Sequence, residues 1–222
     1  MVTMLRQRLE LIEERIGRAL SRAGRKRPEI TLVAITKVFP AETVREAYGL
    51  GLRDFGENYV QEFQSKAPRL ADLPGARFHF VGRLQSNKAR RAAELFQVIE
   101  TIDSGKIARK ISEAGRSVEA MIEVKLSPEQ AKSGVDPEHL AALIEAVRAL
   151  PNLDLTGLMT MPPWSEDAEQ SRPYFRRLRG LAEAHGLRSL SMGMSHDFEV
   201  AIEEGATHLR VGTALFGPRQ RQ

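Results

Sequence analysis

Eight strand-like segments alternate with eight helix-like segments along this chain, and that alternation constrains the fold more than any other feature. The first strand-like segment, ITLVAITK, is rich in β-branched residues and uncharged before its last residue, as expected of a strand buried on both faces. We predict strands at 30–37, 52–55, 77–82, 97–102, 118–126, 153–160, 188–193 and 208–211. We predict helices at 41–50, 58–71, 86–95, 104–115, 136–149, 166–185 and 196–204, and a short one starting near 213.

An additional helix is predicted ahead of the first strand, over residues 3–23. Gly24 follows it and is expected to end it. Its apolar residues recur at steps of three or four and so share one face; they are Leu5, Leu9, Ile12, Ile16 and Leu20. No stretch rich in Pro, Gly or Ser divides the chain. We therefore expect one domain over residues 1–222, with residues 1–24 as its leading helix.

Eight strand–helix units in a chain of 222 residues predict an α/β fold, a single (β/α)₈ TIM barrel with an additional N-terminal helix. The alternative is a doubly wound open sheet. Such a sheet usually has a glycine-rich phosphate loop after its first strand, whereas this chain reads TKVFPAET there, without glycine. The sequence therefore favours the closed barrel.

Composition excludes several classes of function. Cysteine is absent, which excludes thiol catalysis, disulfides and thiolate metal sites. No apolar run approaches the ~20 residues of a membrane span, and the N-terminus is too charged for a signal peptide. We expect a cytoplasmic protein with no membrane partner. The 33 basic residues outnumber the 29 acidic ones only slightly and are dispersed, so we expect no nucleic-acid partner.

The histidines show neither HxH nor HExxH spacing, so we expect no metal site. We expect His79 and His208, which lie in predicted strands, to be satisfied core or mouth residues. The lone Trp164 is expected to be a local packing anchor, and the methionines of LMTM and SMGM to fill the top of the barrel.

Lys37 is the sharpest candidate for chemistry, because active sites of such barrels lie at the C-terminal ends of the strands. Burial there would lower its pKa from ~10.4, and a neutral amine can form a Schiff base with an aldehyde. Alternatively, Lys37 is a lysine at a strand end that pairs with Glu57 or another carboxylate, and Lys37 taken alone favours this explanation. Lys125 is our second choice for a Schiff-base lysine.

The loops after the seventh and eighth strands are the places where barrels often bind a phosphate. Gly193 and Gly212 allow close approach of the backbone to an anion, and Ser195 and Thr213 add hydroxyl donors. Alternatively, both loops are ordinary turns with capping hydroxyls. Closure of the barrel would bring Lys37 beside these loops. A lysine next to a phosphate site suggests a phosphorylated aldehyde, and pyridoxal 5′-phosphate (PLP) fits.

Strand alternation places His208, Arg210 and Gly212 on one side of the last strand and Leu209 and Val211 on the other. The apolar pair should face the helices, so we predict that Arg210 points into the barrel. A buried arginine stays protonated and only donates. Next to a pyridine nitrogen, it would keep that nitrogen unprotonated. A pairing of Arg210 with a carboxylate inside the barrel is equally compatible with the residues alone.

Several motifs together carry a family resemblance over nearly the whole chain. They are AITK, FGENYVQE, HFVGRLQSNK, TIDS, KSGVD, GLMTM and LSMGMSHDFEVAIEEGATHLRVGTALFG. The chain resembles the pyridoxal-phosphate homeostasis (YggS/PLPBP-like) family, single-domain relatives of the N-terminal barrel of alanine racemase. It departs from the family where it reads TKVFP in place of SKTKP and SHDF in place of SxDM.

The resemblance implies that Lys37 holds PLP as an internal aldimine and that Asn58 lies close to the cofactor. Arg210 matches the arginine that faces the pyridine nitrogen. The phosphate-binding segments contain Ser195, Gly212 and Thr213, with Ser191 or Gly193 as further contacts.

We therefore expect a PLP-binding protein of intracellular PLP homeostasis, without robust catalytic turnover. Racemases of this fold use a second base, a tyrosine from a C-terminal β domain, and this chain ends at Gln222 directly after the barrel. Of its tyrosines, only Tyr59 is expected near the mouth. We expect a monomer that delivers PLP to apo-PLP enzymes. The alternatives are a small PLP-dependent amino-acid racemase of fold type III, and an RNA- or protein-binding module with no cofactor.

Overall fold

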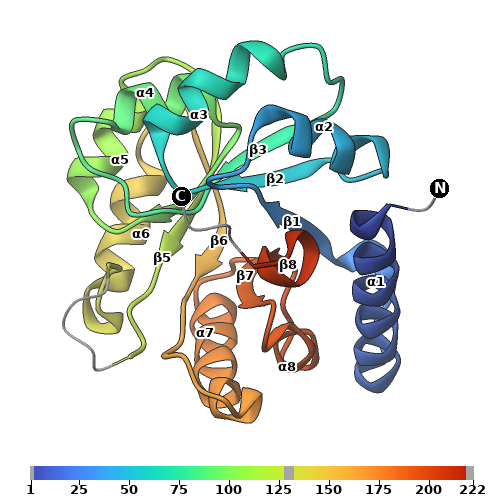
Figure 1. Ribbon diagram of the computed structural model, residues 1–222. Coiled ribbons are helices and arrows are strands. Elements are labelled where there is room, and N and C mark those ends of the chain that lie inside the picture. Colours follow the sequence, from blue (N-terminus) through green and yellow to red (C-terminus); the bar gives the residue numbers. More distant parts are fainter. Residues whose placement is uncertain (1–2, 128–132, 219–222) are drawn as a thin grey trace.

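The computed structural model describes residues 3–127 and 133–218 and shows a closed barrel of eight parallel strands (Figure 1). The strands pair in sequence order, and β8 also pairs with β1, which closes the sheet. Their bounds are Thr31–Ile35 (β1), Asp54–Glu57 (β2), Arg77–Phe80 (β3), Val98–Ile102 (β4), Val118–Glu123 (β5), Leu153–Met159 (β6), Ser189–Met194 (β7) and His208–Val211 (β8). The predicted TIM barrel is confirmed, and the open doubly wound sheet is excluded.

Each predicted helix has a counterpart in the structure. The bounds are Met4–Ala23 (α1), Ala41–Gly49 (α2), Val60–Lys66 (α3), Ala89–Leu95 (α4), Gly105–Ser112 (α5), Leu140–Arg148 (α6), Arg172–Ala184 (α7), Phe198–Glu203 (α8) and Thr213–Phe216 (α9). Several are shorter than predicted. For example, α3 passes into the 3₁₀ turn Ala67–Arg69, where Pro68 removes a backbone donor. In the described part of the chain, every helix is too short or too polar to span a bilayer.

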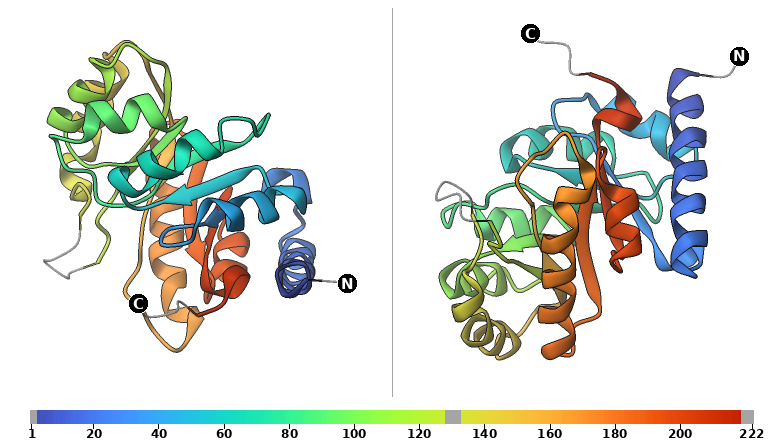
Figure 2. Two further views of the ribbon diagram at one scale, coloured as in Figure 1. Left: turned by 45° about the horizontal axis from the view of Figure 1, so that its top comes forward. Right: turned by 90° about the horizontal axis from the view of Figure 1, so that it is seen from below.

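The leading helix α1 stands on the outer surface of the barrel, beside α8 (Figure 2). Its predicted apolar stripe packs inward, with Ile12 and Ile16 fully buried. Gly24 ends the helix in the left-handed conformation, at φ 65°. Arg15 adds an ion pair of 2.8 Å to Glu199 on α8. The helix therefore covers the side of the barrel near the junction of β8 and β1.

Two different cores lie on the two sides of the sheet. The layer between strands and helices is apolar and includes phenylalanines packed at tilted angles, with the ring centroid of Phe63 4.7 Å from those of Phe78 and Phe96. The interior of the barrel is partly polar. Glu100 on β4 bonds to Ser191 on β7, and since these strands are not neighbours, the contact crosses the interior. Barrel interiors are usually filled by branched apolar side chains, so buried charge here calls for a reason.

Candidate functional site

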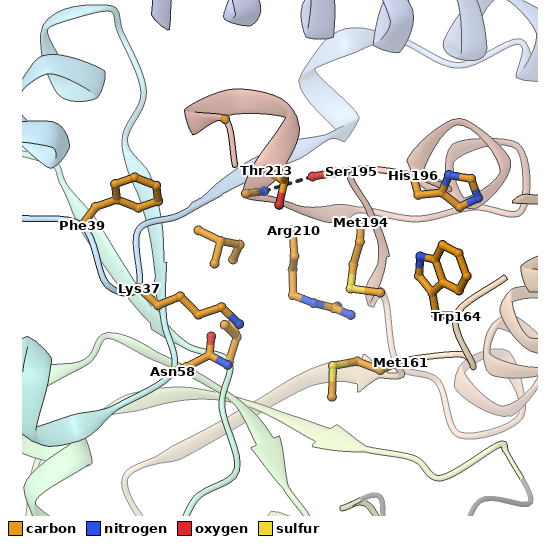
Figure 3. A pocket seen from close by; sticks show the side chains of 14 residues that line it. Lys37, Phe39, Asn58, Met161, Trp164, Met194, Ser195, His196, Arg210 and Thr213 are labelled. Atoms are coloured by element: carbon orange, nitrogen blue, oxygen red, sulfur yellow. Dashed lines mark hydrogen bonds between the residues drawn. The ribbon is translucent and has the colours of Figure 1, made fainter. Parts of the chain in front are cut away.

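A cavity of about 250 Å³ opens at the C-terminal ends of the strands, close to the ~300 Å³ at which small-molecule sites begin. Most of the site residues predicted from the sequence line it, and both Lys37 and Arg210 point into it (Figure 3). The predicted site residues that line it are Lys37, Asn58, Ser195, Arg210, Gly212 and Thr213. Residues as far apart in sequence as Lys37 and Thr213 thus share one cavity, as barrel closure predicted.

Lys37 projects from a tight turn just beyond β1, in which Phe39 N–H donates to Thr36 O over 3.1 Å. The next residue, Val38, has φ 64°. A β-branched side chain rarely adopts this left-handed conformation, and such strain persists only where the surroundings impose it. One restraint is visible, since Val38 N–H donates to Glu62 Oε1 over 2.7 Å.

A buried lysine on α3 fastens the same turn. Lys66 Nζ donates to Thr36 O and Phe39 O, each over 3.1 Å, and so joins the two ends of the turn. It also forms ion pairs with Glu57 Oε1 at 2.6 Å and with Glu62 Oε1 at 2.7 Å, so that its three hydrogens are shared among four acceptors. The Lys37 turn is therefore held by charge-assisted hydrogen bonds, which are stronger than neutral ones.

Glu57, which we considered as a partner of Lys37, is engaged elsewhere. It is the fully buried last residue of β2, and its Oε1 accepts from Lys66 Nζ and from Thr36 Oγ1 at 2.8 Å. Burial raises the pKa of Glu57, and the contacts with Lys66 and Thr36 oppose that shift. The structure thus pairs Glu57 with Lys66.

The loops after β7 and β8 meet at one oxygen atom. Ser195 Oγ accepts from the backbone N–H of Gly212 at 3.3 Å (Figure 3) and from that of Ala214 at 3.2 Å. Backbone N–H groups that converge in this way form concavities that bind anions. A Cβ at Gly212 would lie 3.3 Å from Ile35 Cβ, so glycine allows this loop to pack closely against the end of β1.

Arg210 is buried and points inward, as strand alternation predicted. Its Nη1 donates to Ser191 Oγ at 2.6 Å and its Nη2 to Thr160 O at 2.9 Å. Burial lowers the pKa of Arg210, and the negative charge of Glu100 is the largest opposing effect. The guanidinium still keeps its proton, because its pKa starts so high. Ser191 stands between Arg210 and Glu100, so the expected carboxylate is reached through a hydroxyl.

Asn58 offers an unused acceptor at the cavity. Its Oδ1 is buried and has no hydrogen-bond partner within the described residues. Buried polar atoms are nearly always bonded, so an unbonded one at a cavity is consistent with a ligand group or water. A Cβ at Gly82, in the GRLQSNK motif, would lie 2.2 Å from Asn58 O, so this glycine lets the chain after β3 approach Asn58.

Gly193 does not lie among the cavity-lining residues. It has φ 90°, and a Cβ there would come within 2.5 Å of Ala201 Cβ on α8. Its visible role is therefore close packing of β7 against that helix, and a cofactor contact at Gly193 stays a prediction. Lys125 lies outside this cavity too, with its Nζ 3.9 Å from Asp136.

The sequence missed part of the cavity wall. Trp164 is 75% exposed at the mouth, with its ring 6.4 Å from the ring of His196, so its predicted role as a packing anchor is wrong. Met161 and Met194 line the same cavity, at the top of the barrel where methionines were expected. Trp164 lies in a loop, where no helix or strand periodicity predicts the direction of a side chain. Only its position after the C-terminal end of a strand could have indicated that it lies at the cavity.

Comparison with known proteins places these features in a family. The family model described as "Alanine racemase, N-terminal domain" matches residues 9–220. A relative from Pseudomonas aeruginosa named "Pyridoxal phosphate homeostasis protein" is 47% identical, over 98% of this chain and 97% of that protein. The chain belongs to the pyridoxal phosphate homeostasis proteins of the alanine racemase N-terminal family. Its membership confirms the resemblance predicted from the motifs.

Solved structures agree with this family. PipY of Synechococcus elongatus has been solved without and with PLP bound, and the two structures match with TM-scores of 0.82 and 0.80. They are 40% and 39% identical and cover 91% of this chain, and 99% and 100% of PipY. Alanine racemase of Clostridium difficile matches with a TM-score of 0.70 at 15% identity, over 98% of this chain and 57% of that one. The racemase match shows the shared fold alone.

Proposed function

We propose that this protein binds PLP reversibly and acts in intracellular PLP homeostasis, with the cofactor held on Lys37 and without robust catalytic turnover. The observation that carries the proposal is the convergence of Lys37, Arg210 and the Ser195 loop on one cavity. Membership of the family and the PLP-bound structure of PipY support the choice of ligand.

The donor set of the cavity suits the polar groups of PLP. The amine of Lys37 suits the aldehyde, with which it condenses to an imine and water. The Ser195 hydroxyl, whose oxygen accepts from the N–H groups of Gly212 and Ala214, suits the phosphate as a donor. Arg210 suits an unprotonated ring nitrogen, to which it can only donate.

Low turnover follows from what these residues can do with a proton. Bound PLP supplies an electron sink, whose strength depends on a protonated ring nitrogen. Arg210 has no proton to give up at neutral pH, so the sink beside it is weak. Racemisation also needs a second acid–base group, and within the described residues no tyrosine lines the cavity. Tyr59 is 56% exposed, and the Tyr48 hydroxyl donates to Pro74 O.

A small amino-acid racemase is the second candidate. The observation that favours it is His196, which lines the same cavity and has a side chain able to move a proton. Incubation of the PLP-loaded protein with L-alanine or L-serine, followed by chiral chromatography, separates the two functions. We expect no D-isomer at enzyme-like rates, and such turnover would overturn the binding proposal.

The proposal extends to the oligomeric state of the protein, its location in the cell and the recipients of its PLP. It acts as a monomer in the cytoplasm, with residues 1–222 as one domain, and it releases PLP to the apo forms of PLP-dependent enzymes. Size-exclusion chromatography with light scattering tests the monomer. Activation of a purified apo-enzyme by the loaded protein, compared with an equal amount of free PLP, tests the transfer.

The direct test of the site is borohydride reduction of the PLP-loaded protein, followed by peptide mass mapping. We expect the added mass on the peptide that contains Lys37. Lys37→Ala should abolish the visible absorbance of bound PLP while circular dichroism stays unchanged, and Lys125→Ala serves as the matched control. Retained colour in Lys37→Ala, or a modified Lys125, would contradict the assignment.

A further inference from the structure

A continuous chain of hydrogen-bonded polar side chains runs through the barrel below the cavity. Asp54 Oδ1 lies 3.0 Å from His79 Nε2, and His79 Nδ1 lies 2.7 Å from Glu100 Oε1. Ser191 Oγ donates to Glu100 Oε2 over 2.5 Å, and Arg210 Nη1 donates to Ser191 Oγ over 2.6 Å. The chain ends at Arg210, which lines the cavity.

The route of this chain connects the two ends of the barrel. It starts at Asp54, the first residue of β2, whose side chain is 20% exposed. It passes through His79 on β3 and Glu100 on β4, both completely buried, and crosses the interior to Ser191 on β7. Arg210 on β8 completes it at the C-terminal side, where the cavity lies.

The direction of the bonds at Ser191 is fixed by its chemistry. A serine hydroxyl has a single hydrogen, and here Glu100 Oε2 receives it. The lone pairs of Ser191 Oγ then accept from Arg210. The other terminal nitrogen, Nη2, donates to Thr160 O. Both ends of the guanidinium are therefore held, and the side chain has one defined orientation.

The charges along the chain alternate in sign. Burial would lower the pKa of His79, but its hydrogen bonds to Asp54 and Glu100 outweigh burial and raise that pKa to about 9. Burial would raise the pKa of Glu100, but the hydrogen bond and charge of His79, with the charge of Arg210, lower it to about 2. At neutral pH a carboxylate therefore stands between an imidazolium and a guanidinium.

Other ionisable groups face the same interior. Burial lowers the pKa of His208, whose ring centroid lies 6.1 Å from that of His79. Burial raises the pKa of Glu123 on β5, which accepts from Ser133 Oγ at 2.9 Å. The charges of Glu123 and of Asp197 also act on Arg210, without a hydrogen bond to its guanidinium among those of the described residues. Glu100 alone of these carboxylates is joined to Arg210 by a hydrogen-bonded bridge.

Stability does not explain such an interior. Buried ion pairs contribute little compared with apolar side chains of similar size, because desolvation offsets their attraction. We propose that Glu100, acting through Ser191, is a positioning residue that holds the Arg210 guanidinium in place at the PLP site. This inference rests on the proposed function. It adds Glu100 to the site and gives Ser191 the role of a bridge, although neither residue lines the cavity itself.

The test compares Glu100→Gln and Ser191→Ala with a matched control, Glu123→Gln. Glu123 is also a buried barrel carboxylate, but it lies off the hydrogen-bonded route. The readouts are the PLP dissociation constant from absorbance titration, the pH dependence of the bound-PLP spectrum, and the melting temperature. We expect Glu100→Gln and Ser191→Ala, the two route variants, to bind PLP about tenfold more weakly than the wild-type protein, because each loses one charge-assisted hydrogen bond.

The spectrum provides a readout that a merely structural role would not move. With Arg210 displaced, the ring nitrogen of bound PLP can take up a proton. The two route variants should therefore gain a pH-dependent change of the bound-PLP spectrum that the wild-type protein and Glu123→Gln lack. If Glu100→Gln fails to fold, Ser191→Ala decides, because it keeps both charges and removes only the bridge.

The outcomes distinguish this inference from the proposed function. Wild-type protein that does not bind PLP overturns the proposed function and the inference with it. Wild-type protein that binds PLP, together with route variants of unchanged affinity and spectrum, overturns the inference alone. Equal losses in Glu123→Gln and Glu100→Gln would also overturn it, since the effect would then follow from buried charge in general.

Discussion

Two clusters of buried charge support the cavity from two sides, and they hold different parts of the chain. The lysine-side cluster consists of Thr36, Glu57, Glu62 and Lys66. The arginine-side cluster consists of Asp54, His79, Glu100 and Ser191. The first bonds to backbone carbonyls and fixes a turn, whereas the second bonds to the tip of one side chain, that of Arg210.

The difference follows from where the two site residues stand. Lys37 lies beyond the end of β1, so no strand pairing fixes its backbone, and the strained conformation of Val38 has to be imposed. Arg210 lies within β8, whose backbone is already fixed by pairing with β1 and β7. Only its long side chain is left to order, which costs up to about 2 kcal/mol of rotamer entropy.

Lys66→Met should have the largest effect. It leaves Glu57 and Glu62 without their cation and removes the Lys66 donor from the carbonyls of Thr36 and Phe39, so we expect a loss of about 3–5 kcal/mol in the free energy of unfolding. Urea unfolding followed by circular dichroism measures it, with the exposed Lys106→Met as control. PLP uptake should fall as well, because the Lys37 turn loosens. If Lys66→Met lost no more unfolding free energy than Lys106→Met, the lysine-side cluster would not stabilise the Lys37 turn.

The pH dependence of stability tests the arginine-side cluster. The pKa of His79 is raised from 6.5 to about 9, so its contribution is complete below about pH 6.5 and disappears as the pH rises through about 9. The amount is up to about 3 kcal/mol. Glu100, with a pKa lowered from 4.5 to about 2, contributes fully above about pH 4.5 and loses its contribution as the pH falls through about 2.

Denaturant unfolding at a series of pH values measures these contributions. His79→Gln should flatten the alkaline limb of the stability curve while it leaves the Lys66-dependent part unchanged. An alkaline limb of the same steepness in His79→Gln would show that another group titrates there.

Arg210→Ala should cost less stability, about 2 kcal/mol, because Glu100 keeps its bond to His79. Arg210→Ala should affect cofactor binding more than stability: the absorbance spectrum of bound PLP should change and the affinity for PLP should fall. Absorbance titration beside a thermal melt separates the two effects. An unchanged spectrum and affinity would argue against contact between Arg210 and the ring nitrogen.

Val38→Gly should have the smallest effect and the opposite sign. Glycine adopts a positive φ without strain, and Val38 is 56% exposed, so little burial is lost. We expect a gain of up to about 1 kcal/mol, since relief of strain exceeds the entropy that glycine adds to the unfolded chain. A thermal melt measures it, and destabilisation would show that the turn is unstrained.

Local patterns predicted the elements of the fold and most of the site. Strand and helix periodicity is a property of neighbouring residues, and parallel strands in a barrel place their C-terminal ends on one face. Those two properties together predict that Lys37, Ser195 and Arg210 lie close to one another. Turn boundaries were less accurate, as at Lys37, which was predicted inside the strand and lies two residues beyond it.

Local sequence patterns do not predict which side chains pair when they lie far apart in the sequence. The sequence allowed Glu57 to pair with Lys37, but the position of α3 brought Lys66 to it instead. The bond between Glu100 and Ser191 joins residues 91 apart. It depends on the diameter of the closed barrel and on which side chains reach across it, and no periodicity reports either quantity. The sequence by itself determined a closed barrel with a lysine at its mouth. The tertiary structure decided which buried charges hold that site, because partner choice depends on distances that arise only when all eight strands have closed.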